Sequence, residues 1–100
     1  MAIFAFSVSP LGAGESVADS VAEAVRIVRA SGLPNRTTSM FTEIEGDWDD
    51  VMPVIRAATE AVGAGGHRVS LVVKADLRPG RTGEIDGKVA RVEERLARED

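Results

Sequence analysis

Two different periods of apolar residues open the chain. Apolar and small or polar positions alternate over residues 3–9, and this period of two predicts a β-strand with its large side chains on one face. Over residues 17–28 the apolar positions recur every three to four residues, which predicts a helix. Ser16 suits the N-cap of this helix, and Gly32 suits the left-handed position that ends it.

A threonine-rich stretch follows and favours extended structure. We expect two short strands, residues 36–38 and 42–45, folded about residues 39–41, because a four-stranded sheet needs an extra strand here. One long strand is the alternative, since no glycine marks the turn. The clearest alternation in the chain covers residues 69–77 and predicts the last strand.

Two further helices are predicted. One begins near Asp47, carries a buried apolar stripe that includes Trp48, and ends at a glycine cluster from Gly63. Pro53 conflicts with this start because proline lacks the backbone N–H that a helix interior uses, so a start closer to Asp49 or Asp50 is the alternative. The other helix begins at about Asp86 and carries a narrow apolar stripe among charged residues.

The resulting order is strand, helix, strand, strand, helix, strand, helix. This order predicts an α+β fold, a ferredoxin-like βαββαβ antiparallel sheet with helices on one face plus a C-terminal helix. We expect one domain over residues 1–100, because the chain is too short for two. The uncovered face would carry small or chargeable residues and would either meet solvent or stack on another copy. Those residues are Ala5, Ser7, Ser9, Glu43, Glu45, Ser70, Val72, Lys74 and Asp76.

Composition removes several classes of function. The net charge is −4 and the basic residues are scattered among acidic ones, so nucleic-acid binding is not expected. The absence of cysteine and the presence of a single histidine exclude thiol chemistry and histidine-rich metal sites. The apolar start of the chain is too short to span a membrane and lacks a basic flank, so we expect a cytoplasmic protein with no membrane partner.

Motifs for phosphate binding and catalysis are weak. Gly12 and Gly14 are followed by Glu15 rather than by the Lys-Ser or Lys-Thr of a P-loop, and Val17 holds the place of the third glycine of a dinucleotide site. A structural turn is therefore favoured over an anion site at the helix N-terminus. His67 has no serine or acid at a triad spacing and is interpreted as a loop residue. We expect no enzyme activity and no cofactor.

A small-molecule pocket is the more specific possibility. Thr38 and Thr42, if they point inward, place hydroxyls beneath the helices, where each needs a hydrogen-bond partner. Together with Met40 and Trp48 they would suit a heteroaromatic ligand, although threonines also simply suit strands. Trp48 is either a residue at the border of the core or an aromatic wall for a planar or cationic ligand. Glu43 and Glu45 share a strand face and either bind a cation or form structural ion pairs.

Four segments resemble the small thiamine-binding, YkoF-like family, formerly a domain of unknown function. They are SVSPLGAGESV, FTEIEGDWDDVMPVI, HRVSLVVKADLR and GKVARVEERL, and they cover nearly the whole chain in order. The family usually has Pro-Met-Gly where this chain has Ser39-Met40-Phe41, so the hairpin tip and the pocket beside it differ.

The resemblance implies a ferredoxin-like fold, assembly into dimers and often tetramers through sheets, and binding of thiamine or its hydroxymethylpyrimidine part. It implies ligand contacts at Ser7, Ser9, Thr38, Met40, Thr42 and Glu45, to which we add Phe41 and Trp48 on physical grounds. The leading hypothesis is thus a homo-oligomeric, non-catalytic binding protein. The alternatives are an assembly module without a ligand and, last, an enzyme using Glu43, Glu45 or His67.

Overall fold

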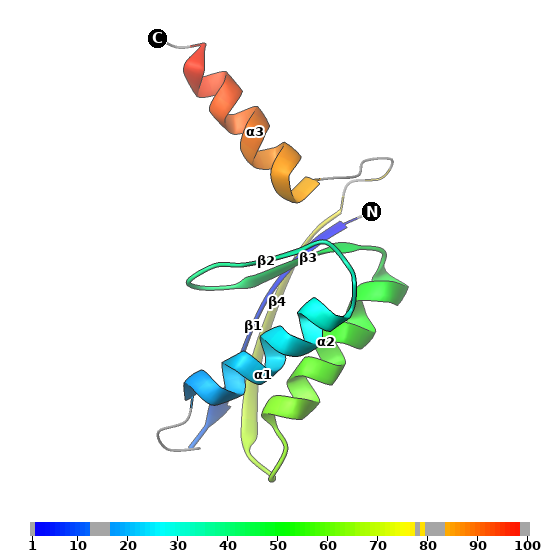
Figure 1. Ribbon diagram of the computed structural model, residues 1–100, viewed down its shortest axis with the longest axis vertical. Helices are drawn as coiled ribbons and strands as arrows, with labels where there is room; N and C mark the ends of the chain where they lie inside the picture. The colour runs from blue at the N-terminus through cyan, green and yellow to red at the C-terminus, as the bar shows by residue number, and fades with distance from the viewer. Residues whose placement is uncertain (1, 13–16, 78, 80–83, 99–100) are drawn as a thin grey trace.

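The computed structural model describes residues 2–12, 17–77, 79 and 84–98 of the chain (Figure 1). The elements follow the predicted order and confirm the α+β fold. They are β1 (Ala2–Leu11), α1 (Val17–Ala30), β2 (Asn35–Thr37), β3 (Thr42–Gly46), α2 (Trp48–Val62), β4 (Arg68–Leu77) and α3 (Glu84–Ala97).

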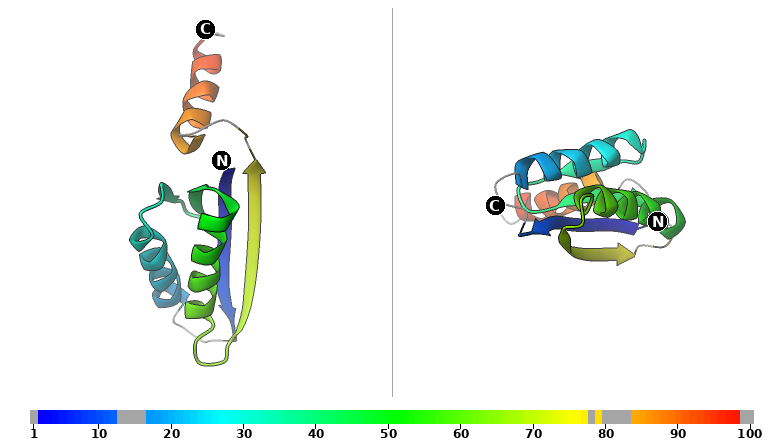
Figure 2. Two further views of the ribbon diagram at one scale, coloured as in Figure 1. Left: turned by 90° about the vertical axis from the view of Figure 1, so that its right-hand side faces the viewer. Right: turned by 90° about the horizontal axis from the view of Figure 1, so that it is seen from below.

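The four strands form one antiparallel sheet in the order β2-β3-β1-β4. Helices α1 and α2 lie side by side on one face of the sheet, which leaves the other face without a helix layer over most of its area (Figure 2). The core lies between these two layers because the even-numbered side chains of β1 point toward the helices. Its fully buried members are Phe4, Phe6, Val28, Ile44, Val51 and Ile55.

The strands differ greatly in length, and this difference shapes both edges of the sheet. β1 and β4 have ten residues each and pair along their whole length, from Ala2 opposite Leu77 to Leu11 opposite Arg68. β3 has five residues and pairs with β1 only as far as Phe6, which lies opposite Thr42. Beyond Phe6, β1 therefore has no strand partner on the β3 side among the described residues.

The helix ends confirm some predictions and correct others. Gly32 has φ +77°, as its predicted left-handed role requires. The predicted cap Ser16 lies outside the described residues. The predicted start of α2 near Asp47 is confirmed, since Asp47 is the N-cap and the helix begins at Trp48. The alternative start closer to Asp49 or Asp50 was wrong: the helix accommodates Pro53 in its interior, because a buried apolar stripe holds it against the sheet.

Trp48 was also predicted to belong to that buried stripe, and this was wrong. Its side chain is 51% exposed, because the first residue of α2 lies at the end of the sheet rather than over it. Only one edge of the indole is covered, by Phe4, with the ring centroids 5.0 Å apart and the planes at 81°.

α3 contacts the sheet through its first turn and then projects beyond it (Figures 1 and 2). Ile85 is buried, whereas the later members of the same apolar stripe are exposed: Val89, Val92 and Leu96. Ion pairs from Asp86 to Arg36 of β2 and from Lys88 to Asp76 of β4 fix the first turn to two strands.

Candidate functional site

A hollow lies beside the part of β1 that β3 does not reach. It has a volume of about 210 Å³ and is enclosed by the end of β1, the tip of the β2–β3 hairpin and one side of α1. Its lining comprises Phe6, Ser7, Val8, Ser9, Val21, Ala24, Val25, Thr37, Thr38, Ser39, Met40, Phe41 and Thr42.

The tip of the hairpin is closed by Thr38. Its backbone N–H and its hydroxyl both donate to the Phe41 carbonyl, at 2.8 and 2.9 Å, and the Phe41 N–H donates back to Thr38 Oγ1 at 3.1 Å. These three bonds supply the turn that no glycine provides. Met40 lies at the tip of the hairpin and is 74% exposed, whereas Phe41 is half-buried.

Polar groups around the hollow lack partners. The Thr42 hydroxyl makes no hydrogen bond to any described residue and lies on the same side of the sheet as Phe6 and the helices. The side chains of Ser7 and Ser9 point to the other face, so β1 offers the hollow its main chain there, which is paired with β4 on one side only. The Thr42 hydroxyl and these main-chain groups are available to a ligand with complementary donors and acceptors.

The rest of the lining is apolar and comes from the core. Phe6 and Val8 of β1 and Val21 and Val25 of α1 form opposing walls. A concave site with apolar walls and a few convergent polar groups is the usual form of a small-molecule site. Its volume is below the roughly 300–1,000 Å³ of sites for drug-sized ligands, so it matches a single ring.

Six of the eight predicted ligand contacts line this hollow, and two do not. The six are Ser7, Ser9, Thr38, Met40, Phe41 and Thr42. Sequence reasoning missed the α1 wall, because Val21 and Val25 recur at helical spacing and no local signal distinguishes a pocket wall from the core.

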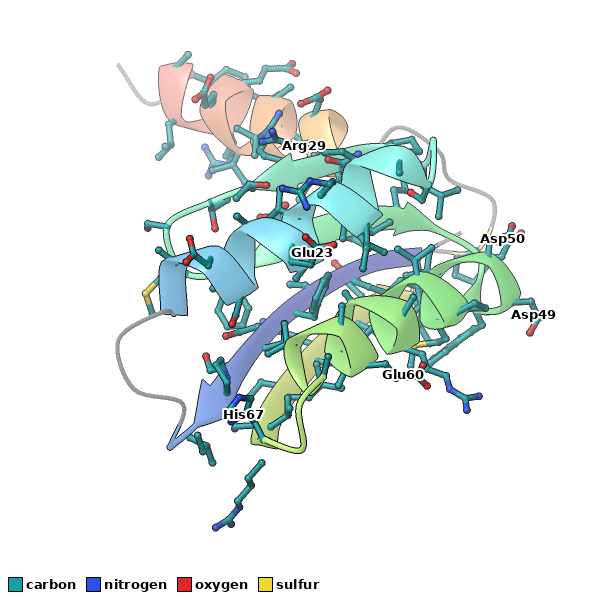
Figure 3. All side chains as sticks on the ribbon, turned by 60° about the horizontal axis from the view of Figure 1, so that its bottom comes forward. Glu23, Arg29, Asp49, Asp50, Glu60 and His67 are labelled. Carbon is teal, nitrogen blue, oxygen red and sulfur yellow. The ribbon has the colours of Figure 1, made fainter. Side chains whose placement is uncertain are left out.

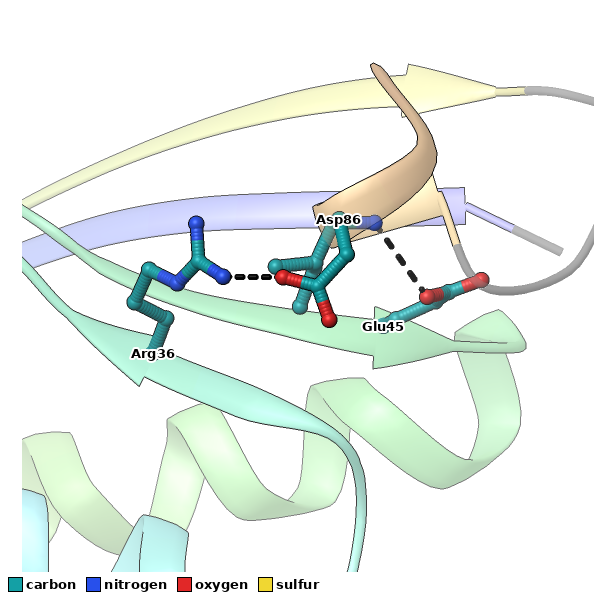
Figure 4. Close-up of polar contacts among 4 residues, drawn as sticks. Arg36, Glu45 and Asp86 are labelled. Carbon is teal, nitrogen blue, oxygen red and sulfur yellow. Dashed lines mark hydrogen bonds and ion pairs between the residues drawn. The ribbon is translucent and has the colours of Figure 1, made fainter. Parts of the chain in front are cut away.

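Glu45 lies on the opposite face of the sheet, beneath the start of α3 (Figure 4). It is 3% exposed, and its Oε1 accepts a long hydrogen bond of 3.5 Å from the backbone N–H of Ile85. Its Oε2 has no partner among the described residues. Because a carboxylate is favourable at a helix N-terminus, the contact indicates that Glu45 docks α3 on β3.

Trp48 borders a separate hollow of about 490 Å³ at the other end of β1, lined also by Ala2 and Leu77 and by the acidic residues Asp47 and Asp49. Ala2 and Ser9 are near opposite ends of the ten-residue strand, so Trp48 cannot touch a ring held between Ser9 and Thr42.

The described part of the chain contains no cluster of side chains that supports a catalytic or metal-binding function. No three histidine, cysteine or acidic side chains gather there into a metal site. His67 lies in the turn between α2 and β4 (Figure 3), next to Arg68 opposite Leu11, whereas Glu45 lies opposite Ile3. The histidine and that carboxylate are thus at opposite ends of β1. No described helix combines the length and the apolar character that crossing a bilayer requires.

Comparison with known proteins gives consistent matches. The family model described as thiamine-binding protein matches residues 4–93. The UPF0045 protein Mb1933 of Mycobacterium bovis is 57% identical over 97 residues, which cover 96% of this chain and 95% of that one. The crystal structure of the hypothetical protein MJ1052 from Methanocaldococcus jannaschii has a TM-score of 0.83 at 29% identity, covering 93% of this chain and 96% of that one. TM0486 of Thermotoga maritima shares the fold, with a TM-score of 0.73 at 16% identity over 85% of this chain and 92% of that one.

Proposed function

Because the chain belongs to the thiamine-binding protein family, we propose that it binds thiamine or its hydroxymethylpyrimidine half, catalyses no reaction and acts as a homo-oligomer. The observation that carries the proposal is the hollow of about 210 Å³ beside β1, where the Thr42 hydroxyl and the main chain of β1 that β3 leaves unpaired lie between apolar walls from β1 and α1. A small-molecule-binding role also agrees with the family to which the chain belongs.

The pyrimidine half of thiamine suits this space better than the thiazolium half. An aminopyrimidine ring has two flat apolar faces, which the walls of β1 and α1 would cover, and ring nitrogens and an amino group at its rim. A threonine hydroxyl can donate and accept, and the main chain of β1 beyond Phe6 carries both N–H and C=O groups, so Thr42 and this strand can match both kinds of rim group. The cationic thiazolium has no carboxylate in the lining of the hollow and would extend toward solvent past the hairpin tip.

Titration calorimetry on the full chain tests the proposal with three ligands: thiamine, hydroxymethylpyrimidine and the hydroxyethylthiazole half. We expect the first two to bind with similar affinity and the third to bind far more weakly. At a hundredfold excess over Kd, a bound ligand should stabilise the fold by about 2.7 kcal/mol, which a thermal melt detects. Absence of heat and of any melting shift with millimolar thiamine and hydroxymethylpyrimidine would remove this function.

A matched pair of variants locates the site. Thr42→Val removes a hydroxyl from the helix side of the sheet, in the hollow, and should weaken pyrimidine binding, whereas Glu45→Gln changes a residue on the opposite face and should leave it unchanged. If Glu45→Gln weakens binding while Thr42→Val does not, the ligand binds on the α3 side of the sheet and the hollow is not the site.

A second candidate function, an assembly module with no small-molecule ligand, is favoured by the exposed stripe of Val89, Val92 and Leu96 on α3. It predicts a stable oligomer and no heat with any of the three ligands. The two functions are therefore separated by the same calorimetry, combined with the mass of the protein in solution.

A further inference from the structure

A second cleft lies on the face of the sheet that α1 and α2 leave uncovered. It has a volume of about 590 Å³, with β1, β3 and β4 as its floor and α3 as its roof. Figure 4 shows the first turn of α3 over this face, on the opposite side of the strands from α2. The volume is within the roughly 300–1,000 Å³ that is usual for small-molecule sites. The cleft shares no lining residue with the hollow beside β1.

Two ion pairs hold the roof of this cleft over its floor. Asp86 of α3 pairs with Arg36 of β2, and Lys88 Nζ of α3 lies 2.5 Å from Asp76 Oδ2 of β4. Ile85, in the same turn of α3, is buried, whereas Leu96 at the far end of the helix is exposed. The cleft is therefore closed at the Ile85 end and open toward Leu96.

The floor carries one acidic and one basic side chain that lack protein partners. Ala5 of β1 lies opposite Glu43 of β3 and opposite Lys74 of β4, so the three side chains form one row on the cleft side of the sheet. Neither the Glu43 carboxylate nor the Lys74 ammonium makes a hydrogen bond or an ion pair with another described residue. Since alanine is small, the space between the two charges stays open. This row favours a ligand that carries both charges.

The spacing of the row matches the charged groups of a free amino acid. Two strand spacings of about 4.8 Å separate β3 from β4, so the Cα atoms of Glu43 and Lys74 are roughly 9.6 Å apart across β1. In an amino acid the ammonium nitrogen and a carboxylate oxygen are about 3 Å apart, and charge-assisted hydrogen bonds of about 2.8 Å on each side extend this span to about 8.6 Å. Two flexible side chains that rise from the floor can hold such a ligand above Ala5.

The roof offers an apolar surface to the remainder of the ligand. Val89 and Val92 are three residues apart on α3, and both line the cleft and are exposed. An aliphatic side chain that rises from the row toward these valines would remove their apolar surface from water.

We propose that this cleft binds a free amino acid with an aliphatic side chain. The Lys74 ammonium donates to the α-carboxylate of the ligand, the Glu43 carboxylate accepts from its α-ammonium group, and Val89 and Val92 contact its side chain. The cleft and the hollow lie on opposite faces of the sheet, so this ligand is additional to the pyrimidine and does not depend on it.

Calorimetry on the full chain with leucine and three analogues tests each contact. We expect leucine to bind and alanine, which lacks the aliphatic group, to bind about tenfold or more weakly. Isopentylamine lacks the carboxylate and isocaproate lacks the ammonium group, so each should also bind about tenfold or more weakly than leucine. Absence of heat and of any melting shift with millimolar leucine would overturn the proposal.

Two variants of matched shape assign the charges. Lys74→Met removes the cation but keeps an aliphatic chain, Glu43→Gln removes the anion, and neither residue is buried, so both variants should fold. Lys74→Met should weaken leucine binding about tenfold but should not weaken isopentylamine binding, because that ligand has no carboxylate. Glu43→Gln should weaken leucine but not isocaproate. Leucine binding that is unchanged in both variants would refute the assignment.

A third variant separates the amino acid from another occupant of the cleft. Val92→Ser changes an exposed wall residue and should reduce the preference for leucine over alanine. If it instead lowers the mass of the protein in solution while leucine gives no heat with any chain, a second copy occupies the cleft and the proposal fails.

The amino-acid site and the pyrimidine site can fail separately. Hydroxymethylpyrimidine should bind all three variants as it binds the wild-type chain, because the hollow lies on the helix side of the sheet. Leucine binding without pyrimidine binding would remove the proposed function alone, and the reverse result would remove this inference alone.

Discussion

Replacing Thr42 by valine should lower ligand affinity and leave the stability of the free protein nearly unchanged. Thr42 is 9% exposed, lies opposite Phe6 in the sheet, and its hydroxyl has no partner among the described residues. Valine has the same shape and suits a strand, so the substitution removes one hydroxyl and little else. In the free protein that hydroxyl still reaches solvent, so its loss changes little. In the complex it would contact the ligand.

The two effects can be estimated separately. The Thr42 hydroxyl is not among the described buried polar atoms that lack a partner, so its removal should change the free energy of unfolding by less than about 1 kcal/mol. A change of that size keeps Tm within roughly 4–8 °C of the wild-type value in a domain of this size. For binding, a ligand group left unpaired in the complex costs roughly 1–3 kcal/mol, which is about 5- to 150-fold in Kd.

Thermal melts and calorimetry with hydroxymethylpyrimidine measure both effects on the same samples. Thr59→Val is the matched control, because its hydroxyl donates to the Ile55 carbonyl at 2.7 Å within α2 and does not line the hollow. The control should bind normally and gain no stability. An unchanged Kd in Thr42→Val would mean that the hollow does not hold the ligand, and a clear loss of stability would mean that the hydroxyl supports the fold.

Two further substitutions test the parts that frame the hollow. Thr38→Val removes both side-chain bonds to Phe41, so amide exchange at Phe41 should accelerate and pyrimidine affinity should fall about 3- to 10-fold, with little change in Tm because the tip is exposed. Unchanged exchange would contradict this role. Gly46→Ala places a Cβ 2.9 Å from Cγ2 of the buried Val51, so urea titration should show a loss of roughly 1–3 kcal/mol. In the Gly46→Ala background, Val51→Ala should lower the free energy of unfolding by less than it does in the wild-type chain. Losses that simply add would contradict the predicted clash.

Much of the fold could be predicted because its elements have clear periods. The alternation in β1 and β4 and the helical spacing in α1 gave the order of elements, and the need for four strands gave the hairpin. Side-chain direction follows from position along a strand, which places Thr42 on the helix side with Phe6 and the side chains of Ser7 and Ser9 on the other face.

The remaining features depend on which segments of the chain cover each helix or strand. The spacing of apolar residues does not predict this. Trp48 has the spacing of a core residue, but it lies at the end of the sheet and stays half exposed. Glu45 lies in a strand beside Thr42, yet α3 covers it from the other face. The apolar stripe of α3 was predicted correctly, whereas its exposure beyond Ile85 follows from the path of the helix away from the sheet.

One property of the sheet underlies the proposed binding site. β1 is about twice as long as β3, so it continues past its neighbour and leaves a gap that the hairpin tip and α1 close into a hollow. Lengthening β3 by the three residues needed to reach Ser9 would fill this gap and pair the main chain of β1 on both sides. Such a change should therefore abolish pyrimidine binding while the rest of the sheet is unaltered.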